Sequence, residues 1–107
     1  MSGEDGRFAG ANLVGARIQG SLADANFAGI TADGSDWSKT GTTNGFFEGI
    51  QLQDSSLKGA NFEGAFLNRA NFALSKLQGA NFRGAFLEET SWFGANIGGA
   101  DFTGARV

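Results

Sequence analysis

Large apolar residues recur every five positions along most of this chain. From residue 60 onward the sequence is ANFEG AFLNR ANFAL SKLQG ANFRG AFLEE TSWFG ANIGG ADFTG ARV, and the third residue of each block is large and apolar. The same phase continues back to Leu22, where one residue is missing, and it resumes at Ile18. Internal repetition is the sequence signature of a repeat architecture, so it constrains the fold more than any other feature.

The five-residue period excludes an ordinary helix and an ordinary flat strand. On an α-helix, residues five apart are rotated by about 140°, so the apolar series would wind around the helix. On a flat strand, successive members would alternate between opposite faces. A short strand with two inward residues and then a tight turn fits the period. A small residue precedes most centres by two positions, and glycine, which suits tight turns, ends many blocks.

A second period of twenty residues sets the number of repeats in each coil. The segment ANFEGAFL at 60–67 recurs as ANFRGAFL at 80–87, which indicates four pentapeptides per coil and therefore four faces. Coils stacked at about 4.8 Å, the spacing of paired strands, would bury equivalent residues in columns, as in other solenoids. The predicted inner columns are Phe62–Phe82–Phe102, Leu67–Leu87–Val107, Phe72–Trp92 and Leu57–Leu77–Ile97.

The pattern of alanine, then asparagine or aspartate, then leucine or phenylalanine resembles that of the pentapeptide-repeat family. It occurs at Ala11-Asn12-Leu13, Ala25-Asn26-Phe27, Ala70-Asn71-Phe72 and Ala100-Asp101-Phe102. The resemblance covers nearly the whole chain and implies an all-β fold, the right-handed quadrilateral β-helix with four faces. We therefore expect a single pentapeptide-repeat β-solenoid domain over residues 1–107, with repeats over about 6–107 and about five coils. The resemblance says little about function, because one fold can carry many functions.

The repeat is least regular around residues 30–45, ITADGSDWSKTGTTNG. Thr42 occupies a core position there, with glycine, threonine and asparagine around it. We interpret this segment either as a degenerate repeat or as a bulged face or short loop, which are features that can carry function.

The composition excludes several classes of function. The formal net charge is −3, and the chain has no cysteine and no histidine. A chain without clustered basic residues lacks the usual footprint of nucleic-acid binding, and one without cysteine has no disulfide or thiolate metal site. The repeat fills the inward positions and leaves no room for a substrate pocket. We therefore expect no enzyme, with no catalytic residue, no cofactor and no metal site.

The beginning of the chain and its hydropathy point to the cytoplasm. The first residues, Met-Ser-Gly-Glu-Asp-Gly, are acidic and polar, unlike the basic and then apolar layout of a signal peptide. No apolar run approaches the length of a membrane span. A cytoplasmic protein without membrane contact is therefore expected.

One outward position departs from the polar pattern of the others. The residues directly before the centres are mostly asparagine, aspartate or serine, but Phe46, Phe66 and Phe86 stand there at intervals of twenty residues. They would stack in adjacent coils, with Arg106 continuing the column and Phe93 widening the patch at the next corner. An apolar patch rimmed by polar groups is typical of a protein-interaction site. The alternatives are that the rings pack over the corner or point into the core.

The end of the chain is a second candidate contact. Val107 belongs to a predicted core column, and no capping helix or polar tail follows it. Solenoids normally need caps, because an open coil exposes apolar columns and unpaired backbone groups. We expect an end-to-end homodimer through the last coil, and the alternatives are that the end frays or that another partner covers it.

These features favour a non-catalytic protein–protein interaction or structural scaffold protein with an unidentified protein partner. The resemblance implies a second hypothesis, a DNA mimic that occupies the DNA site of a type II topoisomerase such as gyrase. Mimicry needs a continuous acidic surface along a long rod, whereas here the acids are scattered and Glu63 is expected to face Arg83 in the next coil. Ice binding by a flat face is the weakest hypothesis, because the threonines are irregularly placed.

Overall fold

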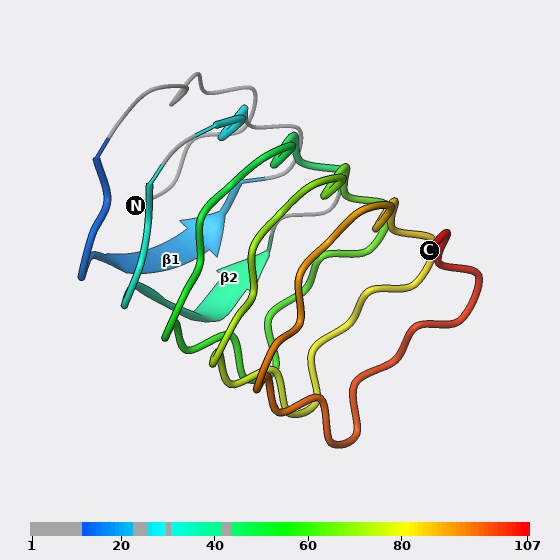
Figure 1. Cartoon of the computed structure of the whole chain (residues 1–107). Coiled ribbons are helices and arrows are strands. Elements are labelled where there is room, and N and C mark those ends of the chain that lie inside the picture. The colour runs from blue at the N-terminus through cyan, green and yellow to red at the C-terminus, as the bar shows by residue number, and fades with distance from the viewer. Residues whose placement is uncertain (1–11, 23–25, 30, 42–43) are drawn as a thin grey trace.

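The computed structural model describes residues 12–22, 26–29, 31–41 and 44–107. Within these ranges the chain winds into a right-handed quadrilateral β-helix of four faces and about five coils, as predicted. Figure 1 shows the coils stacked side by side, and the colour advances from one end of the stack to the other. The Cα atoms extend over 28 × 24 × 23 Å. The expected start of the repeats near Gly6 lies outside the described residues.

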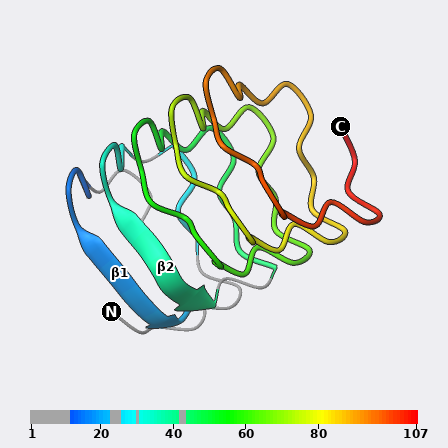
Figure 2. The ribbon, with the colours of Figure 1, turned by 90° about the horizontal axis from the view of Figure 1, so that it is seen from below.

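Parallel pairing between successive coils holds the stack together. Strand β1 (Arg17–Ser21) pairs in parallel with strand β2 (Asp36–Gly41), and Figure 2 shows the two strands side by side on one face. From Asn26 onward, a single residue on each face pairs with the residue twenty positions on, as in Asn61 with Asn81. The predicted coil length of twenty residues is therefore confirmed.

Outside strands β1 and β2, the described corners are tight turns with a left-handed residue. The N–H of Ala60 donates to the carbonyl of Leu57 at 3.1 Å, and the intervening Gly59 has φ of 66°. A turn closed in this way, with positive φ at its third residue, is a type II β-turn, for which glycine is the usual choice. The corner position predicted for glycine is thus confirmed. Non-glycine residues also adopt positive φ at corners: Asn44, Asp54, Arg69, Leu74 and Glu89.

The inward centres form one continuous apolar core. The rings of Phe62 and Phe82 stack at 5.4 Å, those of Phe82 and Phe102 at 5.2 Å, and those of Phe72 and Trp92 at 4.7 Å. The predicted aromatic columns are therefore confirmed. The fully buried side chains of largest volume are Trp37, Phe27, Phe47, Phe62, Phe72 and Phe82.

The missing residue upstream of Leu22 is absorbed by a β-bulge. Arg17 pairs with Asp36, nineteen positions on, whereas Gln19 pairs with Lys39, twenty positions on. One extra residue of β2 therefore lies opposite this part of β1, which is how a bulge reconciles two segments of different length. Within the segment 30–45, which was expected to be irregular, Asp36–Gly41 form a continuous strand in which Trp37 is fully buried. Thr42, the polar residue predicted at a core position, lies outside the described residues.

Within the described ranges, no helix has both the length and the apolar character to cross a membrane.

Candidate protein-interaction surface

The residue directly before each described centre lies on the outside, and where it is asparagine it accepts a hydrogen bond from the backbone of its own corner. Asn61 accepts a hydrogen bond at its Oδ1 from the N–H of Glu63 at 3.0 Å, and Asn81 accepts one from Arg83 at 2.9 Å. This side-chain-to-backbone bond is the common turn motif of asparagine and aspartate. Phenylalanine at the same position cannot make it, so each outward phenylalanine forgoes a local hydrogen bond of its corner.

The phenylalanine column, by which we mean Phe46, Phe66 and Phe86, lies on the outside of the solenoid. The rings of Phe46 and Phe66 are 5.2 Å apart with planes 5° from parallel, and those of Phe66 and Phe86 are 4.8 Å apart with planes 1° from parallel. Phe46 is 45 % exposed and Phe66 is 36 % exposed, while Phe86 is partly exposed. The alternative in which these rings point into the core is therefore wrong.

Arg106 continues the column in the last coil, as predicted. Its backbone pairs with that of Phe86, and its guanidinium carbon lies 5.2 Å from the centre of the Phe86 ring. This distance is within the range of a cation–π interaction. One end of the column is therefore covered by a guanidinium group.

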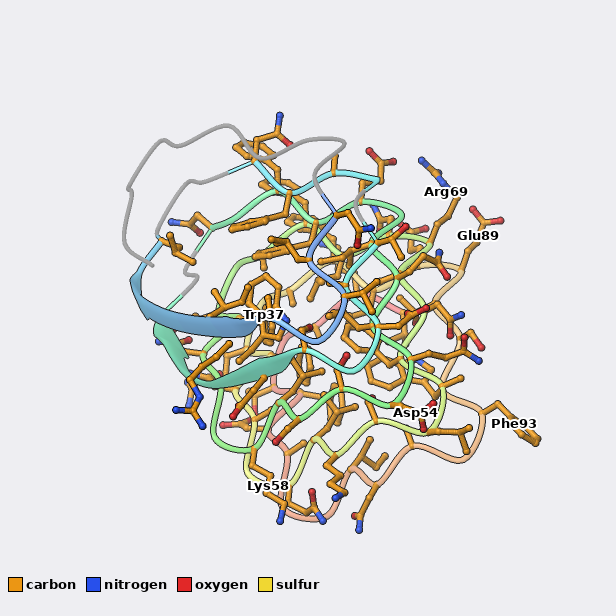
Figure 3. All side chains as sticks on the ribbon, turned by 90° about the vertical axis from the view of Figure 1, so that its left-hand side faces the viewer. Trp37, Asp54, Lys58, Arg69, Glu89 and Phe93 are labelled. Carbon is orange, nitrogen blue, oxygen red and sulfur yellow. The ribbon has the colours of Figure 1, made fainter. Side chains whose placement is uncertain are left out.

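A shallow depression of about 320 Å³ lies beside the other end of the column. Glu48 in its wall forms an ion pair with Arg69, which comes from the next coil. Asn68 also belongs to the wall and accepts a hydrogen bond from the N–H of Glu88 at 2.9 Å. Figure 3 shows Arg69 and Glu89 projecting from this side of the molecule. The depression is lined by Asn26, Ala28, Phe46, Glu48, Phe66 and Asn68.

Phe93 is exposed but does not join the column. It is 78 % exposed, and none of the ring contacts among the described residues links it to the phenylalanine column. Its carbonyl accepts a hydrogen bond from Leu74 at 2.8 Å, and Leu74 is itself 48 % exposed with φ of 60°. Figure 3 shows Phe93 projecting away from Arg69. Our sequence reasoning missed Leu74, although an apolar residue at a corner position was the signal for it.

The last coil exposes apolar side chains and backbone donors. Val107 is 89 % exposed and Ile97 is 46 % exposed, so both lack the cover that their inner columns have elsewhere. In the preceding coil the N–H of Phe82 donates to the backbone carbonyl of Asp101 at 2.8 Å, and the N–H of Leu87 donates to the backbone carbonyl of Arg106 at 2.7 Å. No described residue accepts from the equivalent N–H groups of Phe102 and Val107. Within the described residues, these groups of the last coil therefore have no partner.

The charged residues of the surface pair across coils. Glu63 and Arg83 lie at equivalent positions of adjacent coils, as predicted, but their side chains have other partners: Arg83 forms an ion pair with Asp101 at 3.5 Å, and Glu63 accepts a long hydrogen bond from Asn81. Hydrogen bonds from the hydroxyl and the N–H of Thr103, with a smaller contribution from Arg83, hold the pKa of Asp101 below its ordinary value. The described residues contain no cluster of three or more metal-ligating side chains.

The sequence profile of pentapeptide repeats matches residues 50–89 and 70–106 of this chain, with eight copies in total. No curated protein matches the sequence. Among solved structures, the chain is similar to the pentapeptide-repeat protein Rfr23 of the cyanobacterium Cyanothece 51142. The two are 27 % identical with a TM-score of 0.52, over 89 % of this chain and 63 % of Rfr23.

Two further solved structures are similar to the chain at lower scores. QnrB1, a plasmid-mediated fluoroquinolone resistance protein, is 13 % identical with a TM-score of 0.49, over 98 % of this chain and 72 % of QnrB1. HetL of Nostoc sp. strain PCC 7120, involved in regulating heterocyst differentiation, is 19 % identical with a TM-score of 0.39, over 98 % of this chain and 61 % of HetL. The chain thus spans less than two thirds of the length of the two cyanobacterial proteins.

Proposed function

Because the chain belongs to the pentapeptide-repeat family, we propose that it is a non-catalytic interaction or scaffold protein whose contact surface is the phenylalanine column. One observation carries this proposal. Three rings are stacked on the outside of a core that does not include them. An apolar patch surrounded by polar groups is what protein-interaction sites have in common.

The fold itself does not require phenylalanine at these positions. Asparagine at the same place in other coils accepts a hydrogen bond from its own corner, as Asn71 does from the N–H of Ala73 at 3.0 Å. Phenylalanine gives up that bond and exposes an apolar ring to water. The loss of this hydrogen bond and the exposure of an apolar ring are both unfavourable, and both recur in three successive coils. A partner that covers the rings explains them most simply.

The proposal that the protein is non-catalytic rests on where its side chains lie. The inward positions are occupied by a packed apolar cluster, which leaves the outer surface as the place for function. That surface offers the phenylalanine column, the depression beside it and the last coil. These features suit contact with another protein better than they suit chemistry.

Self-association through the last coil is the second part of the proposal. Two copies that meet there would cover Ile97 and Val107 and bring the free N–H groups of Phe102 and Val107 within reach of acceptors on the other copy. Open strand edges with apolar neighbours are prone to pairing of this kind. The phenylalanine column, on the side of the coils, would remain available to a different partner.

DNA mimicry, the alternative function, has less in its favour. A mimic needs uninterrupted negative charge on its outer surface. In this chain Arg69 lies against Glu48 and Arg83 lies against Asp101, so basic groups are interspersed among the carboxylates. The interaction function therefore remains our proposal.

The test compares the native chain with a variant in which the column carries Phe46→Asn, Phe66→Asn and Phe86→Asn. Asparagine fits this position in other coils, so the variant should fold with an unchanged circular dichroism spectrum. The matched control carries Ser56→Asn and Lys76→Asn at the same repeat position on another face. We expect proteins captured from cell extract by the native chain and by the control to be lost from the column variant. Equal capture by all three would overturn the proposal.

A further inference from the structure

The two ends of the phenylalanine column are covered differently. Phe86 has the guanidinium of Arg106 over its ring at 5.2 Å. At the other end, the backbone of Phe46 pairs with that of Asn26 in the preceding coil. The Oδ1 atom of Asn26 accepts a hydrogen bond from the N–H of Ala28 at 3.0 Å, so this side chain is turned toward its own corner. Phe46, which is 45 % exposed, is left to line the depression instead.

The surroundings of the depression are acidic. Glu48 lines it, and Glu88 and Glu89 occupy the equivalent corner two coils further along. Arg69 is the one basic residue at these corners within the described part of the chain. With Arg106 over Phe86 counted as well, three carboxylates outnumber two guanidinium groups on this side, and the resulting negative local charge attracts cations.

We propose that the depression binds an arginine side chain of a partner protein, with the guanidinium against Phe46 and the carboxylate of Glu48. The arrangement would repeat at Phe46 what Arg106 does at Phe86. Arginine fits better than lysine, because a planar guanidinium stacks on an aromatic ring and can bond a carboxylate through two N–H groups. A carboxylate has enough acceptor sites for Glu48 to keep Arg69 as well. This inference rests on the proposed function, since it names the chemistry of the partner at the same surface.

The experiment is a titration of ¹⁵N-labelled protein with the peptide acetyl-Gly-Arg-Gly-amide, followed by amide chemical shifts. The control peptide carries citrulline, the neutral isostere of arginine. We expect the arginine peptide to shift the amide signals of Asn26, Ala28, Glu48 and Asn68, and the citrulline peptide to leave them in place. Added salt should weaken the effect, because the carboxylate contact is partly exposed.

Two variants separate the two contacts of the guanidinium. Glu48→Gln removes the charge and keeps the shape, and we expect it to weaken binding by about two- to fivefold, the usual value of an exposed ion pair. Phe46→Asn removes the ring and should weaken binding by a similar factor, about two- to fivefold for an exposed cation–π contact. Glu63→Gln, a matched change on another face, should leave binding unchanged.

The outcomes distinguish this inference from the function on which it rests. Equal shifts with arginine and citrulline, no shift at these amides, or binding unaffected by both Glu48→Gln and Phe46→Asn would each overturn the arginine site. If capture from extract still depends on the column in that case, the proposed function stands without it. If capture does not depend on the column, the proposed function fails whatever the peptides do.

Discussion

The solenoid contains two aromatic columns with nearly the same geometry and different surroundings. The inner column, Phe62–Phe82–Phe102, stacks at 5.4 and 5.2 Å with planes within 6° of parallel. The outer phenylalanine column stacks at 5.2 and 4.8 Å with planes within 5° of parallel. Phe62 and Phe82 are fully buried, whereas Phe46 and Phe66 are exposed. Stacking therefore follows from the coil register, while burial follows from the position within the repeat.

This difference shows which contacts hold the fold together. Phe82 also meets Phe72 and Trp92 edge to face, at 5.8 and 5.9 Å, so the inner column is joined to its neighbours across the core. The rings of the outer column stack on one another, and part of their surface is in water. The inner column should therefore determine stability, and the outer column should determine binding.

The sharpest test of this comparison is the same truncation in each column. Phe82→Ala should lower the free energy of unfolding by about 3–5 kcal/mol, the usual cost of emptying a phenylalanine site in a core. Phe66→Ala should lower it by no more than about 1.5 kcal/mol, because that ring is partly exposed and loses mainly stacking contacts. Urea denaturation followed by circular dichroism measures both values. Similar losses for the two variants would refute the distinction between the columns.

The sequence was sufficient to predict both columns, and the reason is physical. A constant period places equivalent residues one above another, so the stacks of Phe62 on Phe82 and of Phe66 on Phe86 follow from counting residues. Local deviations do not follow from a period. The bulge opposite Arg17 depends on how two strands of unequal length pair, and the choice of Asp101 rather than Glu63 by Arg83 depends on side-chain conformation.

In the candidate site, too, some features follow from the repeat period and others do not. The members of the outer column and its continuation at Arg106 could be predicted from spacing. The depression beside Phe46 could not be predicted from spacing, because it depends on the side chain of Asn26, which turns toward its own corner. Phe93, which was expected to widen the patch, is exposed and lies beside Leu74, and its part in an interaction stays a prediction.

The second test concerns the last coil, where the columns end differently. The inner columns end in exposed Ile97 and Val107, and the outer column ends in Arg106. If copies pair through this coil, Ile97→Lys with Val107→Lys should weaken self-association at least about tenfold, because like charges and lost apolar area both oppose contact. Sedimentation equilibrium over a range of concentrations measures the constant. The column variant with three asparagines should associate as the native chain does, and a loss of dimer in that variant would place self-association on the outer column instead.

A third and smaller effect is expected at Arg106. Arg106→Gln removes the cation over Phe86 and should lower the free energy of unfolding by about 0.5–1 kcal/mol, the value of an exposed cation–π contact. Lys58→Gln, an exposed change elsewhere, is the control and should leave stability within about 0.5 kcal/mol of the native chain. Equal effects of the two changes in urea denaturation would mean that the guanidinium contributes nothing to the outer column beyond its net charge.

The smallest effect concerns Asp101, the residue directly before Phe102 at the end of the inner column. Its Oδ1 accepts hydrogen bonds from the N–H of Thr103 at 3.0 Å and from the hydroxyl of Thr103 at 2.6 Å, which fix the corner that follows Phe102. These bonds, with Arg83 contributing less, lower the pKa of Asp101 below its ordinary value of 3.8. A carboxyl group with a lowered pKa stabilises the folded state above its unfolded pKa, and this contribution disappears as the pH falls through the folded pKa.

Stability should therefore decline slightly as the pH drops below about 4, the ordinary pKa of aspartate. Asp101→Asn keeps the acceptor oxygen for Thr103 but removes the charge, so it should flatten this part of the pH profile. Thermal unfolding of the native chain and the variant between neutral and acidic pH measures the difference, with Asp54→Asn as a control at another corner. If thermal stability depends on pH in both variants as it does in the native chain, the carboxylate of Asp101 does not help to hold the end of the inner column. Packing against Phe82 would then be what keeps Phe102 in place.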